Sequence, residues 1–254
     1  MNILLCGDFL HTGYQFCKCF NIPKDKKVNI LFCTYSLEYG EEYNNATTLA
    51  LHRAFNVGKI IQLTPNYDFS DQIDVICING GKDLNNLIVK LNSVNHVQKI
   101  KQLVENGAIY IGISTGAIIA GEYPAHLFEG EISKENELLR KNFDGFKFIP
   151  QVFVPHTSKY RFPYNFDIPF NFPTYRIHNT TSQGINPLYR NLKLIKIIKS
   201  LNKTAISIKE NEVFVITPSK QGKLVFNWSH LPVKQNVVTK DEEKIKNLIK
   251  QNNK

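Results

Sequence analysis

The chain has 254 residues, of which 43% are hydrophobic and 21% are charged, and it carries a formal net charge of +9. This length and apolar content suit one sizeable hydrophobic core and argue against disorder over most of the chain. The basic residues are spread along the sequence without a stripe interleaved with aromatic residues, so we expect a solvated surface and no nucleic-acid partner.

The sequence gives no sign of a membrane segment, and its cysteines give no sign of a metal site. The first residues lack the pattern of a secretory signal, and no run of about 18 apolar residues could cross a bilayer. The spacing of Cys17, Cys19 and His11 fits no standard metal site, while Cys6, Cys33 and Cys77 lie in apolar or strand-like runs. We therefore expect a reduced cytoplasmic protein with no metal and no cofactor.

The first 120 residues alternate between apolar strand patterns and helical patterns. Strands are predicted over Asn2–Cys6, Lys27–Tyr35, Lys59–Thr64, Ile73–Ile78 and Ala108–Ile113, and helices over Ala46–Phe55, Asp83–Leu91 and Val97–Glu105. Continuous apolar strands separated by helices predict an α/β fold: a doubly wound, mostly parallel sheet with helices on both faces. Ligands of such sheets bind beyond the carboxyl ends of the strands.

The second half of the chain has a looser pattern. It contains a strand at Phe148–Val154, a helix at Leu188–Leu201 and three late strands in a hairpin-like arrangement, Ala205–Ile208, Val213–Thr217 and Lys223–Asn227. The segment Arg161–Pro187 is rich in proline and aromatic residues, which is consistent with a lid or with an irregular packed segment. We expect one α/β domain over residues 1–239 and a charged helical tail over residues 240–254.

A serine between two glycines follows the fifth strand. The segment Gly112-Ile113-Ser114-Thr115-Gly116 joins an apolar run to a small-residue helix start, which is the layout of a nucleophile elbow. Such a turn strains the serine backbone and lifts its hydroxyl clear of the sheet. Because Gly-Ser-Gly sequences also occur in ordinary turns, the motif alone leaves a structural turn open.

A serine nucleophile needs a base, an acid and an oxyanion hole. His156 has the best placement of the seven histidines, because it directly follows a strand and a proline. Glu210 and Glu212 alternate onto one face between two late strands, so either could orient the imidazole. The backbone N–H groups of the Gly80-Gly81 pair and of Thr115 could hold the oxyanion.

Three sequence blocks resemble peptidase family S51, the dipeptidase E group of serine hydrolases. These are Ile78-Asn79-Gly80-Gly81-Lys82-Asp83-Leu84, Ile111-Gly112-Ile113-Ser114-Thr115-Gly116-Ala117 and Val154-Pro155-His156. The similarity covers roughly residues 70–230. The resemblance implies a fold like that of class I glutamine amidotransferases, a flavodoxin-like three-layer sandwich, and a substrate that is a short peptide.

The resemblance also implies roles for individual residues. Ser114 would be the nucleophile, His156 the base and Glu210 the acid, with Glu212 as the fallback, while the N–H groups of Gly81 and Thr115 would form the oxyanion hole. The order Ser, His, acid separates this family from the α/β-hydrolases, in which the acid precedes the histidine. A glutamine amidotransferase proper would need a cysteine nucleophile, and no cysteine follows Cys77.

The chain departs from the family pattern at three places that bear on substrate choice. Thr115 replaces the usual alanine, Lys82 replaces an asparagine, and Arg190 lies only near the position of the basic residue that aspartyl-specific members use. A catalytically silent binding protein and a non-peptidase amide or ester hydrolase remain alternatives. The sequence predicts no membrane partner and leaves a homodimer open.

Overall fold

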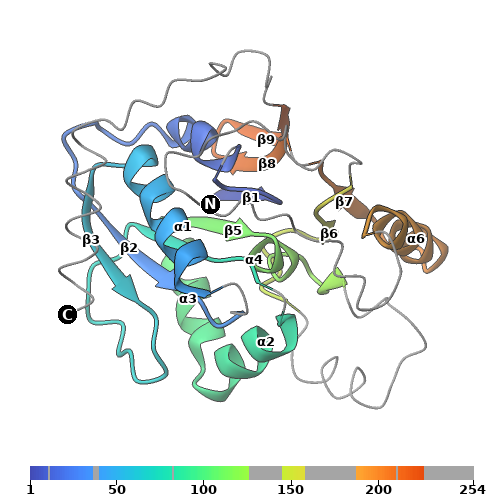
Figure 1. Cartoon of the computed structure of the whole chain (residues 1–254), viewed down its shortest axis with the longest axis horizontal. Coiled ribbons are helices and arrows are strands. Elements are labelled where there is room, and N and C mark those ends of the chain that lie inside the picture. Colours follow the sequence, from blue (N-terminus) through green and yellow to red (C-terminus); the bar gives the residue numbers. More distant parts are fainter. Residues whose placement is uncertain are drawn as a thin grey trace.

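The computed structural model describes residues 1–10, 12–36, 40–81, 83–125, 145–157, 187–209 and 211–225. Seven strands form one sheet in the order β3-β2-β4-β5-β1-β8-β9 (Figure 1). Their bounds are Asn2–Cys6 for β1, Val28–Cys33 for β2, Val57–Gln62 for β3, Val75–Ile78 for β4, Ile109–Ile113 for β5, Glu212–Thr217 for β8 and Lys220–Val225 for β9. The first five strands in this order are parallel, and β8 and β9 add an antiparallel edge. The predicted mostly parallel sheet is confirmed.

Helices cover both faces of this sheet. The helices of the described chain are η1, a 3-10 helix at Gly13–Phe20, and the α-helices α1 at Gly40–Ala54, α2 at Leu84–Ser93, α3 at His96–Glu105, α4 at Thr115–Ile118 and α6 at Pro187–Ser200. Successive side chains of β1 point to opposite faces of the sheet, and the core has one buried cluster on each face. Ile3 and Leu5 belong to one cluster, and Leu4 and Cys6 belong to the other. The first cluster contains the apolar side chains of α2, α3 and α6, and the second contains those of η1 and α1.

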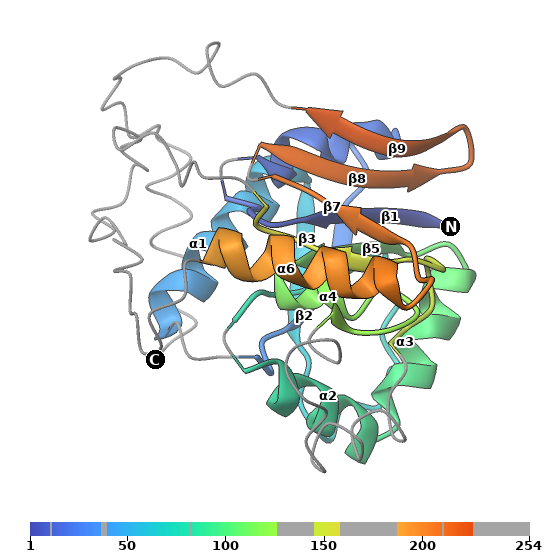
Figure 2. The same cartoon turned by 90° about the vertical axis from the view of Figure 1, so that its right-hand side faces the viewer.

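The described chain also forms a second, two-stranded sheet. Its strands β6 (Val152–Val154) and β7 (Ala205–Ser207) pair in parallel, and they lie beside α6 at one side of the molecule (Figure 1). The expected hairpin-like arrangement of the three late strands is therefore correct for β8 and β9, which pair with each other, and wrong for β7, which pairs with β6. The physical reason is that the apolar pattern of a short strand predicts that it is buried but does not determine which other strand it pairs with. Figure 2 shows α6 lying across the view, with β9, β8 and β1 stacked in that order.

The carboxyl ends of four strands meet at one edge of the large sheet. The register aligns Cys33 of β2 with Ile78 of β4, Ile78 with Gly112 of β5, and Cys6 of β1 with Ile113 of β5. The chain leaving β4 and the chain leaving β5 therefore emerge side by side, as the sequence predicts. Among the described residues, no helix has both the length and the apolar content that a membrane crossing needs. The predicted tail at 240–254 lies outside the described residues.

Candidate active site

Ser114 occupies a strained turn between β5 and α4. Its backbone angles are φ 50° and ψ −105°, a conformation that costs a non-glycine residue on the order of 1–3 kcal/mol. Hydrogen bonds hold the residue on both sides. The Ser114 N–H donates to the Cys6 carbonyl at 2.8 Å, and the Ser114 carbonyl accepts from the N–H groups of Ala117 and Ile118, both at 3.0 Å. This is the geometry expected of a nucleophile elbow.

The two glycines of the motif are required by close packing. A Cβ on Gly112 would lie 2.7 Å from the Gly116 carbonyl oxygen, and a Cβ on Gly116 would collide with the Ile78 carbonyl oxygen. The Gly116 carbonyl is also bound, because the buried Tyr110 hydroxyl donates to it at 2.7 Å. Burial raises the pKa of Tyr110 well above its ordinary value, so this hydroxyl stays protonated and remains a donor.

The side chain of His156, which follows the small sheet, lies close to that of Ser114, which follows the large sheet. Its Nε2 lies 3.0 Å from Ser114 Oγ, although the two residues are 42 positions apart in the chain. His156 comes two residues after β6 and has a left-handed backbone with φ 59°. The strand that presents the histidine, β6, belongs to the two-stranded sheet.

Of the two candidate acids, Glu210 lies outside the described residues, but the chain on either side of it can be followed. The β6–β7 pairing continues beyond Ser207, since the Ile208 N–H donates to the Val154 carbonyl at 3.1 Å and the Thr157 N–H donates to the Ile208 carbonyl at 3.0 Å. The chain therefore reaches position 209 alongside the His156 loop.

Glu212, the fallback acid, has other partners. Its carboxylate accepts from the Lys209 N–H at 2.9 Å and lies 4.0 Å from Lys223 Nζ. None of its hydrogen bonds within the described chain joins it to His156. The described contacts of Glu212 are thus those of a turn-closing side chain.

The Gly80-Gly81 turn lies directly against the nucleophile. A Cβ on Gly80 would stand 3.1 Å from Ser114 Cβ, which places the end of β4 beside the elbow. Within the described residues, the N–H groups of Gly81 and Thr115 donate no hydrogen bond. The side chain of Thr115 is buried, and its Oγ1 donates to the Asn79 carbonyl at 3.4 Å. Within the described chain, two backbone N–H groups without an acceptor therefore lie in the two turns that meet at the serine.

Comparison with known proteins places this chain in a family. The model of peptidase family S51 matches residues 26–216, which is most of the chain. The chain belongs to peptidase family S51. Membership in this family implies serine peptidase activity, and the three blocks that carry the resemblance in sequence all lie within the matched range.

A solved structure supports the same fold for this S51 chain. The crystal structure of a "Putative Peptidase E Protein" from Listeria monocytogenes EGD-e superposes with a TM-score of 0.61 at 18% sequence identity, covering 89% of this chain and 98% of that one. At this identity the likeness shows the fold alone. No curated protein sequence matches the chain.

A polar network behind the Gly80-Gly81 turn of the S51 chain was not anticipated from the sequence. Asn79 is fully buried, and its Oδ1 accepts from the Gly80 N–H at 2.9 Å and from Thr47 Oγ1 at 3.3 Å. Its Nδ2 donates to Asn44 Oδ1 at 2.9 Å, and the Ser36 hydroxyl donates to its backbone carbonyl at 3.0 Å. The sequence does contain a signal for this network, an asparagine directly before a glycine pair. An asparagine side chain in a turn often accepts a hydrogen bond from a backbone N–H that follows it.

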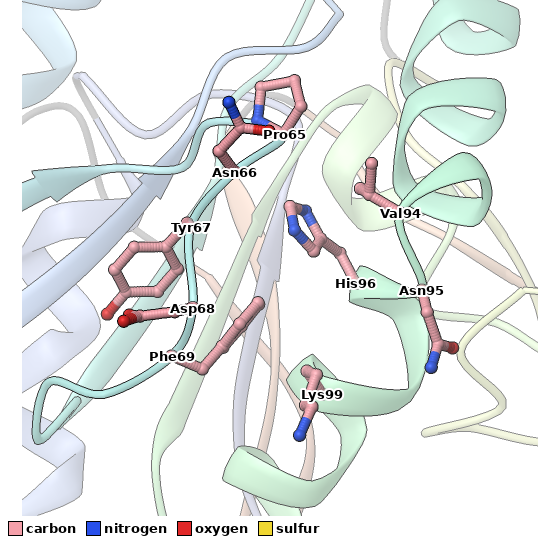
Figure 3. Close-up of a pocket in the computed structure, with 9 residues that line it drawn as sticks. All are labelled: Pro65, Asn66, Tyr67, Asp68, Phe69, Val94, Asn95, His96 and Lys99. Atoms are coloured by element: carbon pink, nitrogen blue, oxygen red, sulfur yellow. The ribbon is translucent and has the colours of Figure 1, made fainter.

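One hollow of the described chain lies away from the Ser114–His156 pair. It has a volume of about 300 Å³ and opens between the loop after β3 and the turn joining α2 to α3, with Tyr67, Phe69, His96 and Lys99 among its walls (Figure 3). Ser114 and His156 do not line it. The reactive geometry, rather than hollow volume, therefore identifies the candidate site in this S51 chain.

Two further expectations concern ligands. Arg190 lies in the first turn of α6, and its side chain is outside what the structure describes. Within the described ranges no three His, Cys, Asp or Glu side chains gather as metal ligands would. The described part of the candidate site thus contains Ser114, His156 and the backbone amides of the two neighbouring turns.

Proposed function

We propose that this chain is a serine-type peptidase of the dipeptidase E kind that hydrolyses short peptides through a Ser-His-Glu triad. The observation that carries the proposal is the 3.0 Å separation of Ser114 Oγ and His156 Nε2 at a strained elbow. This distance lies within the hydrogen-bond reach that a general base requires. Family membership supports the same chemistry.

The geometry accommodates both proton transfers of an acyl-enzyme mechanism. With Nε2 unprotonated, His156 accepts the Ser114 proton as Oγ attacks the scissile carbonyl, and the carbonyl π electrons move onto the oxygen. When the tetrahedral intermediate collapses, the C–N bond breaks and the imidazolium returns the proton to the leaving amine. Water then attacks the acyl-enzyme with His156 again as base, releasing the acid and restoring Ser114.

The developing oxyanion would be held by the N–H groups of Gly81 and Thr115. Removing one such donor typically lowers kcat by about 10²–10³-fold. Ser36 and Asn79 fix the turn that presents Gly81, since a Cβ at Gly81 would collide with the Ser36 carbonyl oxygen. The donors are therefore held in place before the substrate arrives, which is the condition for electrostatic stabilisation of a transition state.

Replacing Thr115 with valine is expected to preserve most of the activity, because the proposed donor at this position is the backbone N–H. Valine keeps the shape but removes the 3.4 Å hydrogen bond to the Asn79 carbonyl, which costs about 0.5–1.5 kcal/mol of stability. Urea unfolding and kcat/KM of the purified variant check both parts. A 100-fold fall in kcat/KM at unchanged folding would show instead that the hydroxyl takes part in the reaction.

Replacing Glu210 with glutamine is expected to lower kcat by about 10²–10⁴-fold, because glutamine cannot stabilise the imidazolium that forms on His156. Glu212→Gln is the matched control, since Glu212 binds the Lys209 N–H and lies near Lys223. Its variant should keep kcat within a few-fold. Steady-state kinetics of the two variants side by side tests the assignment, and the reverse ranking would identify Glu212 as the acid.

A substrate panel separates this proposal from its alternatives. We expect hydrolysis of dipeptides, with a preference for an N-terminal aspartate if Arg190 binds the substrate side chain. Hydrolysis of aryl esters or simple amides without any dipeptide would favour the non-peptidase hydrolase. Binding of dipeptides without turnover of any substrate would favour a catalytically silent protein. Each outcome is read against the Ser114→Ala variant.

A further inference from the structure

The backbone of the proposed base is held from two neighbouring elements. His156 has a left-handed backbone with φ 59°, an uncommon conformation for a residue with a side chain. Left alone, a short loop after a three-residue strand would relax toward ordinary angles and carry the imidazole with it. We propose that Asn191 of α6 is a positioning residue that keeps His156 Nε2 within reach of Ser114. This inference rests on the proposed function of the Ser114–His156 pair.

The contacts of Asn191 suit this role. Its Nδ2 donates to the Pro155 carbonyl and to the His156 carbonyl, both at 3.0 Å. Because both acceptors are carbonyl oxygens, only the NH₂ end of the amide can serve them, and its two hydrogens match the two bonds. One side chain therefore clamps the peptide units on either side of His156 Cα. Since these units define φ and ψ of the histidine, the clamp fixes the direction in which the side chain leaves the backbone.

The clamp is carried by a helix that packs into the core. Leu194 and Ile198 of α6 are 3% and 0% exposed and belong to the buried cluster that the helix shares with the main sheet. On the other side of the histidine, the Thr157 hydroxyl donates to the Ile208 carbonyl at 2.8 Å. The loop is thus tied to Ile208, the residue after β7, and to α6 through Asn191. Loss of the α6 contact would remove the two bonds that hold the peptide units on either side of His156 Cα.

A change in the position of the base affects rate more than stability. Displacement of a catalytic group by about 1 Å can lower a rate about 100-fold. Alanine at position 191 is a better helix former than asparagine, so the helix itself gains from the substitution while the clamp is lost. A rate that falls while the unfolding temperature stays constant therefore separates positioning from general structural support.

The test uses the rate at which a fluorophosphonate probe labels the full-length protein, because this reaction needs an activated serine but no knowledge of the substrate. We expect Asn191→Ala to be labelled about 10–100-fold more slowly than the parent protein. Asn191→Asp has the same shape but presents carboxylate oxygens to two carbonyls, so it should be at least as slow. Lys193→Ala, an exposed position on the same helix, serves as the control and should be labelled at the parental rate.

A spectroscopic measurement accompanies the rates. In ¹H–¹³C NMR spectra, the His156 ring signal should shift or split in Asn191→Ala, while the ring signals of His52 and His96 stay in place. Parental labelling rates in both Asn191 variants would overturn the inference, as would slow labelling that follows a matching fall in the unfolding temperature. Failure of the proposed function looks different, because the parent protein would then remain unlabelled or Ser114→Ala would be labelled normally.

Discussion

Ser114→Ala is expected to abolish peptide hydrolysis, with kcat falling by about 10³-fold or more. The reason is that the Ser114 hydroxyl forms the acyl bond in the proposed mechanism, and it is the hydroxyl that lies 3.0 Å from His156 Nε2. What activity remains would come from substrate binding and the oxyanion donors acting on water. Initial rates on the best dipeptide of the panel measure the effect.

The matched control for this prediction is another serine whose hydroxyl also forms a hydrogen bond. Ser200 is exposed at the end of α6, where its Oγ donates to the Ile197 carbonyl at 2.8 Å. Ser200→Ala should hydrolyse dipeptides at the parental rate. If Ser114→Ala kept a rate comparable to this control, the nucleophile would have to be sought elsewhere in the chain.

Gly116→Ala is expected to damage both folding and activity. The new methyl group would collide with the Ile78 carbonyl oxygen, and this acceptor is backbone, so it cannot turn away as a flexible side chain would. Relief requires α4 to move off β4, which also strains the 2.7 Å bond from the Tyr110 hydroxyl to the Gly116 carbonyl. We expect a loss of about 1–3 kcal/mol in the free energy of unfolding and a displaced Ser114.

Urea unfolding combined with fluorophosphonate labelling measures the two parts of this prediction. Gly58→Ala is the control, because a Cβ there would approach Asn29 Oδ1 and Lys27 Cβ at 3.1 and 3.2 Å, both side-chain atoms. The control should unfold near the parental midpoint and label at the parental rate. Parental behaviour of Gly116→Ala would mean that the elbow is less tightly packed against β4 than the structure indicates.

The main sheet could be predicted from the sequence because its signals are local and repeated. Buried parallel strands are apolar along their whole length, and each of the first five is bounded by turn residues or a helical pattern. Helix α6 was predicted within one residue at each end, as Leu188–Leu201 against the observed Pro187–Ser200. The fold and the family are confirmed on this basis.

The pairing of β6 with β7 could not be predicted in the same way. Three-residue strands carry little periodicity, and their register depends on partners about 50 residues away. The 3-10 helix η1 was missed for a related reason, since short 3-10 segments lack the long apolar stripe that identifies a helix. Both elements depend on tertiary contacts more than on local sequence.

The residues of the candidate site also differ in whether local sequence reveals them. Ser114 and the Gly80-Gly81 turn were found because steric limits on backbone conformation leave a trace in the sequence as glycine. Asn191 donates to backbone carbonyls 36 and 35 residues away, and nothing in its local sequence distinguishes it from a surface asparagine. The roles of Ser114, His156 and Glu210 stay predictions, to be decided by kinetics.

The most direct test of the central claim is to find where the covalent probe attaches. The parent protein is treated with a fluorophosphonate, digested, and analysed by peptide mass spectrometry. We predict a single adduct on Ser114 and a much slower reaction in a His156→Ala variant. An adduct on another residue, or peptide hydrolysis that continues at full rate without any adduct, would contradict the assignment of Ser114 as the nucleophile.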